Sequence, residues 1–473
     1  MKTLLLTAVS TALVSTALAA APKNVILFIG DGMSVQQRMT ADEFARKSGQ
    51  PELVMNRLPS QAMTRTCSAS SLVTDSAAAA TAIACGEKTY NGAVGVNAGT
   101  NRIFSCAVAA KESGRKVGIV TTVTINHATP AGFYGHRKDR GEGYGLGLDL
   151  LASGFDYFAG GGLDGHDDKA GAKDEYRGDI YKLAKEAGYA FIRKDLAAFK
   201  ALKPGAGKVW YVASDGCMPF AIDAGEWKDK PTLAEMTAKG IELLENDKGF
   251  FMMVEGGKVD WAGHANDAAT NLREVLALDE AVRVALDYQK AHPDTLIVTT
   301  GDHETGGMSM GFAGTGYALY VDRLANQKCS SDRIGSYIGK RHPATFEDLK
   351  PFLSANFGFD FGGKCTKENP MALTDAELKE LVDAFAHDLE MAKKGKKDDE
   401  AYDAKKISRL PTAVKNVFSH KCGIGWSSGA HTAQPVLTTA CGPGAERFAG
   451  FLENTDISKI LKELVKQGTG NRD

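Results

Sequence analysis

Residues 24–32 read NVILFIGDG, five apolar residues after Asn24 that lead into a Gly-Asp-Gly turn. A run that is apolar at every position predicts a central strand of a sheet that helices cover on both faces. Three later runs have the same character: KVGIVTT from Lys116, GFFMMV from Gly249 and TLIVTT from Thr295. Segments with helical periodicity lie between them, so the chain predicts an α/β fold, a three-layer sandwich with a largely parallel central sheet and helices on both faces.

Side chains that can bind a metal follow each of these four predicted strands. In chain order they are Asp31, then His127 and Thr129, then Glu255, then Asp302 and His303. Because ligands bind at the carboxyl ends of the strands in open α/β sheets, we expect these side chains to gather at one edge. One acidic residue after a strand commonly starts a turn, but four such coincidences favour a shared site.

Two further segments contain residue types that bind zinc. In EGGKVDWAGHAND, Asp260 and His264 lie four residues apart, which places both side chains on one face of a helical turn. In GWSSGAHTAQP, His431 lies in a Gly/Ser-rich loop, where a solvent-facing histidine is the plainer alternative. A mixed set of carboxylate and imidazole suits zinc better than calcium, which prefers oxygen alone.

Residues 73–86, VTDSAAAATAIACG, place the hydroxyl of Ser76 at the start of an alanine-rich helix. Asp75 is a good N-cap residue, and the first turn of a helix presents unpaired N–H groups and a positive dipole that suit a phosphate. An ordinary capped helix without a ligand is the alternative interpretation of this stretch.

Six segments in order resemble the alkaline phosphatase family: LFIGDGM, VTDSAAAATA, NHATPAGFYGHRKDR, VEGGKVDWAGHAND, TGDHETGG and GAHTAQPV. They span Asp31 to His431 and so cover nearly the whole chain after its first twenty residues. The resemblance implies a phosphoric monoester hydrolase with a broad substrate range, an alkaline optimum and a phosphoserine intermediate. It also implies two zinc ions and one magnesium ion as cofactors.

The resemblance assigns a role to each matching residue. Ser76 is implied to be the nucleophile and Arg140 to bind the phosphoryl oxygens, oriented by Asp75. The implied metal ligands are Asp260, His264 and His431 for the first zinc, Asp31, Ser76, Asp302 and His303 for the second, and Asp31, Thr129 and Glu255 for magnesium. Some bacterial members have Asp and Lys where this chain has His127 and Trp261, which indicates another branch of the family.

The chain divides into two parts by sequence. Residues 1–20, MKTLLLTAVSTALVSTALAA, are typical of a secretory signal and too short for a convincing membrane span. We therefore expect an exported protein, periplasmic or extracellular, with one catalytic domain over residues 21–473. Residues 311–425 leave the matching motifs and are predicted to be a crown-like insertion, which in family members forms a dimer contact, so a homodimer is implied.

The composition narrows the partners further. A formal charge of −2 gives no reason to expect binding to nucleic acid or to an anionic membrane. Eight cysteines, an even number in an exported chain, indicate disulfides, and Cys422 and Cys441 on either side of His431 are one candidate pair.

Three other functions remain to be weighed against a phosphomonoesterase. A related phosphodiesterase differs only in its ester, whereas a sulfatase needs a Cys or Ser in a CxPxR-like context, which TDSAAAA lacks. A non-catalytic protein that binds metal or phosphate would not require both Ser76 and Arg140. Hydrolysis of a phosphate monoester, a diester and a sulfate ester, with and without a chelator, distinguishes these functions.

Overall fold

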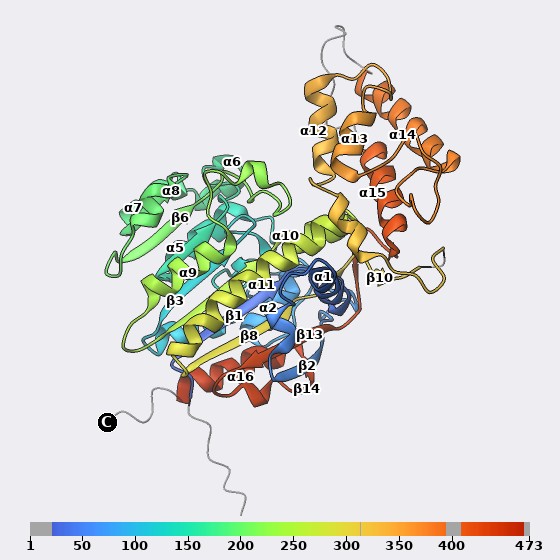
Figure 1. Cartoon of the computed structure of the whole chain (residues 1–473). Helices are drawn as coiled ribbons and strands as arrows, with labels where there is room; N and C mark the ends of the chain where they lie inside the picture. The colour runs from blue at the N-terminus through green and yellow to red at the C-terminus, as the bar shows by residue number, and fades with distance from the viewer. Residues whose placement is uncertain (1–20, 313, 394–407, 468–473) are drawn as a thin grey trace, which may run out of the picture.

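The computed structural model describes residues 21–312, 314–393 and 408–467. Its central element is a ten-stranded sheet in which β1 (Asn24–Gly30) lies between β7 (Phe250–Gly256) and β8 (Thr295–Gly301) and is parallel to both (Figure 1). On the far side of β7, β3 (Lys116–Thr121) continues the parallel pairing. All four strands predicted from apolar runs are therefore confirmed, and they are adjacent.

Six further strands complete the sheet. Beyond β3 the order is β4 (Tyr157–Gly160), β6 (Lys208–Val212) and β5 (Tyr189–Arg193), and beyond β8 it is β13 (Val436–Cys441), β2 (Ser60–Arg65) and β14 (Gly450–Glu453). Only β13 runs antiparallel to its neighbours in this sheet, β8 and β2. The sheet is thus mixed but mostly parallel, as predicted.

Side chains of β1 alternate between two hydrophobic cores. Ile26 and Phe28 pack into one core, and Val25, Leu27 and Ile29 pack into the other. The first core is covered by α1 (Val35–Lys47), α8 (Leu196–Ala201), α9 (Leu233–Leu244), α10 (Lys258–His264) and α11 (Ala268–Ala291). The second is covered by α2 (Ser76–Cys85), α3 (Cys106–Glu112), α4 (Ala128–Ala131), α5 (Gly143–Ser153), α7 (Ile180–Glu186) and α16 (Asn454–Gln467).

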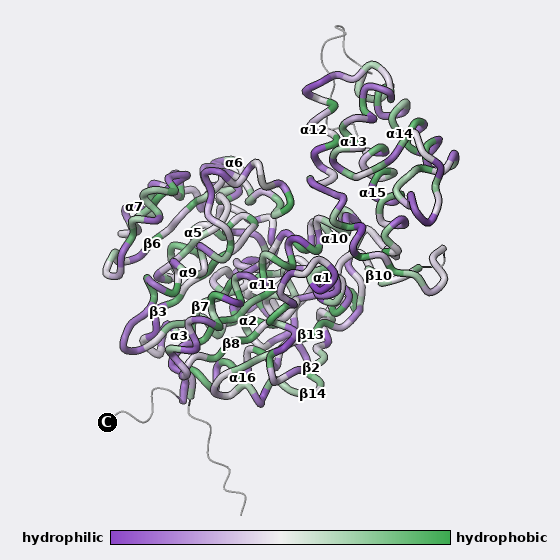
Figure 2. The backbone as a smooth tube through the Cα atoms, viewed as in Figure 1, coloured by the Kyte–Doolittle hydropathy of each residue, from purple (hydrophilic) through white to green (hydrophobic). Residues whose placement is uncertain are grey.

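Two covered faces explain why the central strands carry apolar residues on both faces over most of their length, and Figure 2 shows hydrophobic colouring around β7 and β8. The three-layer sandwich predicted from the sequence is confirmed.

A group of helices stands to one side of the sheet. Strand β10 (Met308–Met310) pairs antiparallel with β11 (Ile424–Trp426), and the chain between them contains α12 (Asp332–Arg341), α13 (Lys350–Phe357), α14 (Asp375–Lys393) and α15 (Arg409–Cys422). These four helices, here named the cap, lie together beside the sheet in Figure 1. Helix α14 lies within the insertion predicted at residues 311–425, and residues 394–407 after it lie outside the described residues.

Two buried carboxylates hold the start of the cap against the sheet domain. Asp223 accepts hydrogen bonds from the backbone N–H and the hydroxyl of Ser330, at 2.9 and 2.7 Å. Asp267, which caps α11, accepts the backbone N–H of Ser331 at 2.9 Å. Arg333 adds a 3.3 Å ion pair to Asp223. These contacts fix the point where the chain enters α12.

The disulfide expected between Cys422 and Cys441 is not present, because all eight cysteines, which lie within the described residues, are free thiols. Cys422 ends α15 in the cap, whereas Cys441 ends β13 opposite Ile297, near the start of β8. Since β13 runs antiparallel to β8, it carries the chain away from the edge where His431 lies. The two cysteines bracket His431 in sequence, but Cys422 lies in the cap and Cys441 lies in the sheet, near the start of β8.

No helix among residues 21–312, 314–393 and 408–467 is long and apolar enough to cross a membrane. The predicted signal at residues 1–20 lies outside the described residues.

Replacing Asp223 with alanine is expected to loosen the cap. The change leaves two donors of Ser330 without their acceptor, which costs about 1–3 kcal/mol of unfolding free energy. Thermal unfolding and limited proteolysis near residue 330 measure the effect. As a control in the cap, Lys379→Ala should cost less than about 1 kcal/mol, because its ion pair with Asp383 is exposed. Equal stability of the two variants would contradict the prediction.

Candidate active site

The turn after β1 places Asp31 at the carboxyl edge of the sheet. Gly32 adopts a positive φ of 72°, and a Cβ there would lie 2.8 Å from Cα of Asp260, so only glycine fits. The Gly32 N–H donates to Oδ1 of Asp302 at 3.1 Å. This close approach brings the segments that contain Asp31, Asp260 and Asp302 together.

Ser76 is the first residue of α2, and it lies beside Asp31. Asp75 caps the helix by accepting the N–H of Ala78 at 2.9 Å. The Ser76 hydroxyl lies 3.4 Å from Oδ1 of Asp31 and 3.1 Å from Nε2 of His303. The alanine run has a packing reason: a Cβ at Gly132 would lie 2.9 Å from Cβ of Ala80, so α2 and α4 are in close contact. Small side chains thus seat the serine in a crowded site.

Asp31, Asp302 and His303 form the first of three groups that could hold a metal ion. Nε2 of His303 lies 3.2 Å from Asp31 and 3.5 Å from Asp302, and all three side chains are fully buried. This group contains the residues that the sequence analysis assigned to the second zinc, with Ser76 next to it.

Asp260, His264 and His431 converge from α10 and from β12 (His431–Thr432). Oδ1 of Asp260 lies 3.4 Å from Nε2 of each histidine, and the two Nε2 atoms are 3.1 Å apart. Each histidine also places Nδ1 2.8 Å from a backbone carbonyl, Gly429 for His264 and Thr74 for His431. A carbonyl only accepts, so each Nδ1 donates its proton there, and each Nε2 is the ring atom left to face Asp260 and the other histidine. Three converging acceptors fit a cation between them.

The geometry also groups His303 with Asp260 and His431. His303 therefore lies between the two sets of ligands that the sequence analysis separated. Because His303 belongs to both groups, the two candidate zinc positions are neighbours.

The third group joins Asp31, Glu255 and His127. Oγ1 of Thr129 lies 3.4 Å from Oδ2 of Asp31, and Thr121 donates a hydrogen bond to Oε2 of Glu255. The family resemblance does not assign His127 as a metal ligand, whereas the structure brings Nδ1 of His127 to 4.0 Å from Asp31.

Unpartnered atoms show that the site suits cations. Among the described residues, the buried carboxylate oxygens Oε1 of Glu255 and Oδ2 of Asp302 have no hydrogen-bond partner. Burial, and then the nearby carboxylate of Asp31, raises the pKa of both Glu255 and Asp302 well above the usual range. Burial lowers the pKa of His127, which favours the neutral ring. Divalent ions would satisfy these acceptors and offset the crowded negative charge.

Arg140, His127 and Trp261 form a chain of contacts that begins at Asp75, the residue before Ser76. The guanidinium of Arg140 lies 3.3 Å from Asp75 and 3.1 Å from Nε2 of His127. Trp261 meets the His127 ring edge-on at 6.3 Å and remains 37% exposed. One cation thus lies beside the residue before Ser76, and an exposed aromatic ring lies beside His127.

Two residues of the quoted motif TGDHETGG have roles that the sequence analysis missed. Oγ1 of Thr305 donates to Asp260 at 2.5 Å and lies 3.3 Å from Nδ1 of His303, so it links the two candidate zinc groups. Glu304 is fully buried beside it. Glu304 and Thr305 directly follow the candidate ligands Asp302 and His303, and this position is the sequence signal that could have identified them.

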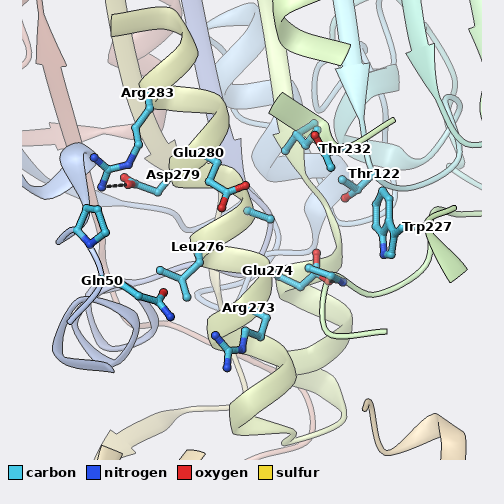
Figure 3. Close-up of a pocket in the computed structure, with 14 residues that line it drawn as sticks. Gln50, Thr122, Trp227, Thr232, Arg273, Glu274, Leu276, Asp279, Glu280 and Arg283 are labelled. Carbon is cyan, nitrogen blue, oxygen red and sulfur yellow. Dashed lines mark hydrogen bonds and ion pairs between the residues drawn. The ribbon is translucent and has the colours of Figure 1, made fainter. Parts of the chain in front are cut away.

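A separate groove of about 500 Å³ crosses α11 (Figure 3). Trp227, Arg273 and Glu274 are among its lining residues, and none of the residues in the three metal groups lines it. The groove is therefore distinct from the site around Ser76.

Comparisons with known proteins agree with this geometry. A family model described as alkaline phosphatase matches residues 22–467. Alkaline phosphatase 3 of Bacillus subtilis is 34% identical over 456 residues, covering 93% of this chain and 89% of that protein. The crystal structure of a cold-active alkaline phosphatase from a psychrophilic Shewanella has a TM-score of 0.77 and 29% identity, covering 93% of this chain and 99% of that one.

A variant of the alkaline phosphatase from the Antarctic bacterium TAB5, with a histidine replaced by aspartate and magnesium bound in its M3 site, has a TM-score of 0.63 and 27% identity. It covers 95% of this chain and 99% of that chain. Because the family model spans almost all of the described residues and the resemblance noted in the sequence is confirmed, this chain belongs to the alkaline phosphatase family.

Proposed function

We propose that this alkaline phosphatase hydrolyses phosphate monoesters through a phosphoserine at Ser76, with two zinc ions and one magnesium ion bound around it. The strongest support is the convergence of Asp260, His264 and His431 within 3.4 Å, next to His303, which lies 3.1 Å from the Ser76 hydroxyl. Such an arrangement has no structural use without a cation.

The donor sets favour the assignment of each metal. The first zinc would be held by Asp260, His264 and His431, and the second by Asp31, Asp302, His303 and the Ser76 oxygen. Magnesium would be held by Asp31, Thr129 and Glu255, an oxygen set of the kind it prefers. When bound, the metals lower the pKa of a hydroxyl or water and stabilise negative charge on oxygen.

The chain's own residues would carry out two displacements at phosphorus. Oγ of Ser76 attacks the phosphorus, the bond from phosphorus to the ester oxygen breaks, and an alcohol leaves. Water then attacks the phosphoserine, the bond from Oγ to phosphorus breaks, and inorganic phosphate is released. Arg140 suits two phosphoryl oxygens because its planar fork can donate to both, and the first turn of α2 adds backbone N–H groups.

The open side of the site supports a broad substrate range. Trp261 and His264 are both exposed, so the leaving group would face solvent instead of a closed pocket. A site that contacts the phosphoryl group but not the alcohol portion of the ester discriminates weakly between esters of different alcohols. An alkaline optimum is proposed on the family resemblance.

Two further proposals concern the whole protein. The apolar, serine- and threonine-rich first twenty residues support export to the periplasm or the exterior. The family resemblance supports a homodimer in which the insertion at residues 311–425, within a single catalytic domain, contributes a crown.

Removing metal should abolish activity. We expect the untreated enzyme to cleave a chromogenic phosphate monoester at alkaline pH much faster than a matched diester or sulfate ester. Dialysis against a chelator should remove the activity, and zinc with magnesium should restore it. Equal rates on the diester, or full activity after complete metal removal, would contradict the proposal.

Ser76→Ala is expected to abolish phosphoserine formation while zinc content stays close to that of the wild type. Turnover should fall by roughly 10³-fold or more because the nucleophile is lost. Labelled phosphate bound covalently after an acid quench, together with zinc per chain, measures both quantities. Recovery of label from the alanine variant at the wild-type level would exclude Ser76 as nucleophile.

The double variant His127→Asp, Trp261→Lys should bind phosphate more tightly and turn over more slowly. The imidazole of His127, in the group with Asp31 and Glu255, would become a carboxylate that holds magnesium more strongly, and the TAB5 variant with aspartate in place of a histidine does bind magnesium. A lysine at the site entrance should lower the phosphate inhibition constant about 10-fold, as one added cation near an anion does.

Phosphate inhibition, turnover at alkaline pH and magnesium retained on dialysis should be measured for both single variants and the double variant, since neighbouring changes need not add. Unchanged or weaker phosphate inhibition in the double variant would show that these residues do not set product release.

A further inference from the structure

Glu304 lies between the candidate ligand His303 and Thr305, and its carboxylate is fully buried. Four donors reach it: Nε2 of Gln37 at 2.7 Å, the N–H of Gly307 at 3.0 Å, the N–H of Met308 at 3.2 Å, and the hydroxyl of Thr432. None of these donors belongs to a candidate metal ligand. Both carboxylate oxygens are therefore fully engaged in holding protein segments.

The four donors come from three of the segments that contain candidate zinc ligands. Gln37 lies in the first turn of α1, where its Oε1 accepts the N–H of Ser34 at 3.1 Å, three residues after Asp31. Gly307 and Met308 follow the Asp302–His303 pair. Thr432 follows His431 directly, and β12 pairs antiparallel with β9 (Glu304–Thr305), with Thr432 opposite Glu304.

We propose that Glu304 is a positioning residue that fixes the distance between the two zinc sites by tying the His431 segment to the Asp31 and His303 segments. The proposal rests on the metal assignment above. A carboxylate is required because only a group with two acceptor oxygens and no hydrogen can take four donors here. In Glu304→Gln, the amide N–H groups would face the donors on one side, and those hydrogen bonds would be lost.

Replacing a residue whose hydrogen bonds orient the metal ligands typically weakens metal binding or activity about 10–100-fold. We therefore expect the free zinc concentration at half-occupancy of the weaker site in Glu304→Gln to rise by about 10–100-fold. Thr432→Val removes one donor and should give a smaller rise, whereas Thr432→Ser keeps the hydroxyl and should behave like the wild type.

The experiment is a titration of zinc bound per chain in chelator-buffered zinc, run on metal-depleted full-length protein. The four proteins are the wild type and the three variants above, with Glu274→Gln as a matched control. Glu274 is likewise buried and accepts a backbone N–H, from Ala221 at 2.6 Å, but lies in the groove over α11, away from the metal groups. Thermal melts of the metal-depleted proteins show whether each variant is folded.

Zinc curves of Glu304→Gln and Thr432→Val that match the curve of Glu274→Gln would overturn the role of Glu304. If Glu304→Gln does not fold, the comparison of Thr432→Val with Thr432→Ser decides the question, and equal curves for that pair overturn the proposal. Failure of the wild type to bind zinc would contradict the proposed function itself, a result distinct from either of these.

Discussion

The structure depends on holding several buried carboxylates and imidazole rings close together at the carboxyl end of β1. Four of the acidic side chains there are buried: Asp31, Glu255, Asp260 and Asp302. Nε2 atoms of the neighbouring histidines lie within 3.5 Å of these carboxylates or of each other. Left to themselves these groups would repel one another, so the backbone must hold them by other means. Gly32, which permits the close approach to Asp260, and the helix start at Ser76 are two of those means. The large apolar sheet supplies the rigidity that makes such crowding tolerable.

The centre of the fold was predictable, and its edges were not. Strands β1, β3, β7 and β8 are buried on both faces, so their sequences are continuous apolar runs. Strand β2, SQAMTR, alternates exposed and buried residues at one side of the sheet and has no comparable signal. The antiparallel direction of β13 depends on tertiary pairing alone. That direction is also why Cys441 lies near the start of β8 and not beside Cys422 in the cap.

The candidate site likewise contains residues that were predictable from the sequence and residues that were not. Residues whose chemistry is distinctive, such as Asp260 and His264 four apart on α10, could be recognised from type and spacing. Glu304 and Thr305 act through hydrogen bonds to segments remote in sequence, and spacing carries no record of such contacts. The nearness of His127 to Asp31 and Glu255 likewise follows from how β3 and β7 align, which only the packed sheet reveals.

The position of β13 has a consequence for the order in which the protein can mature. Among the described strands, β2 pairs only with β13 and β14, and β13 joins it to β8. Both partners of β2 follow the cap in sequence, so β2 cannot join the sheet before they are present. The same late segment contains His431, the final member of its ligand set. A nascent chain emerging from its N-terminus therefore has both an unclosed sheet edge and an incomplete chelate. The strands that complete this side of the sheet and the last candidate zinc ligand therefore join the fold together, after the cap.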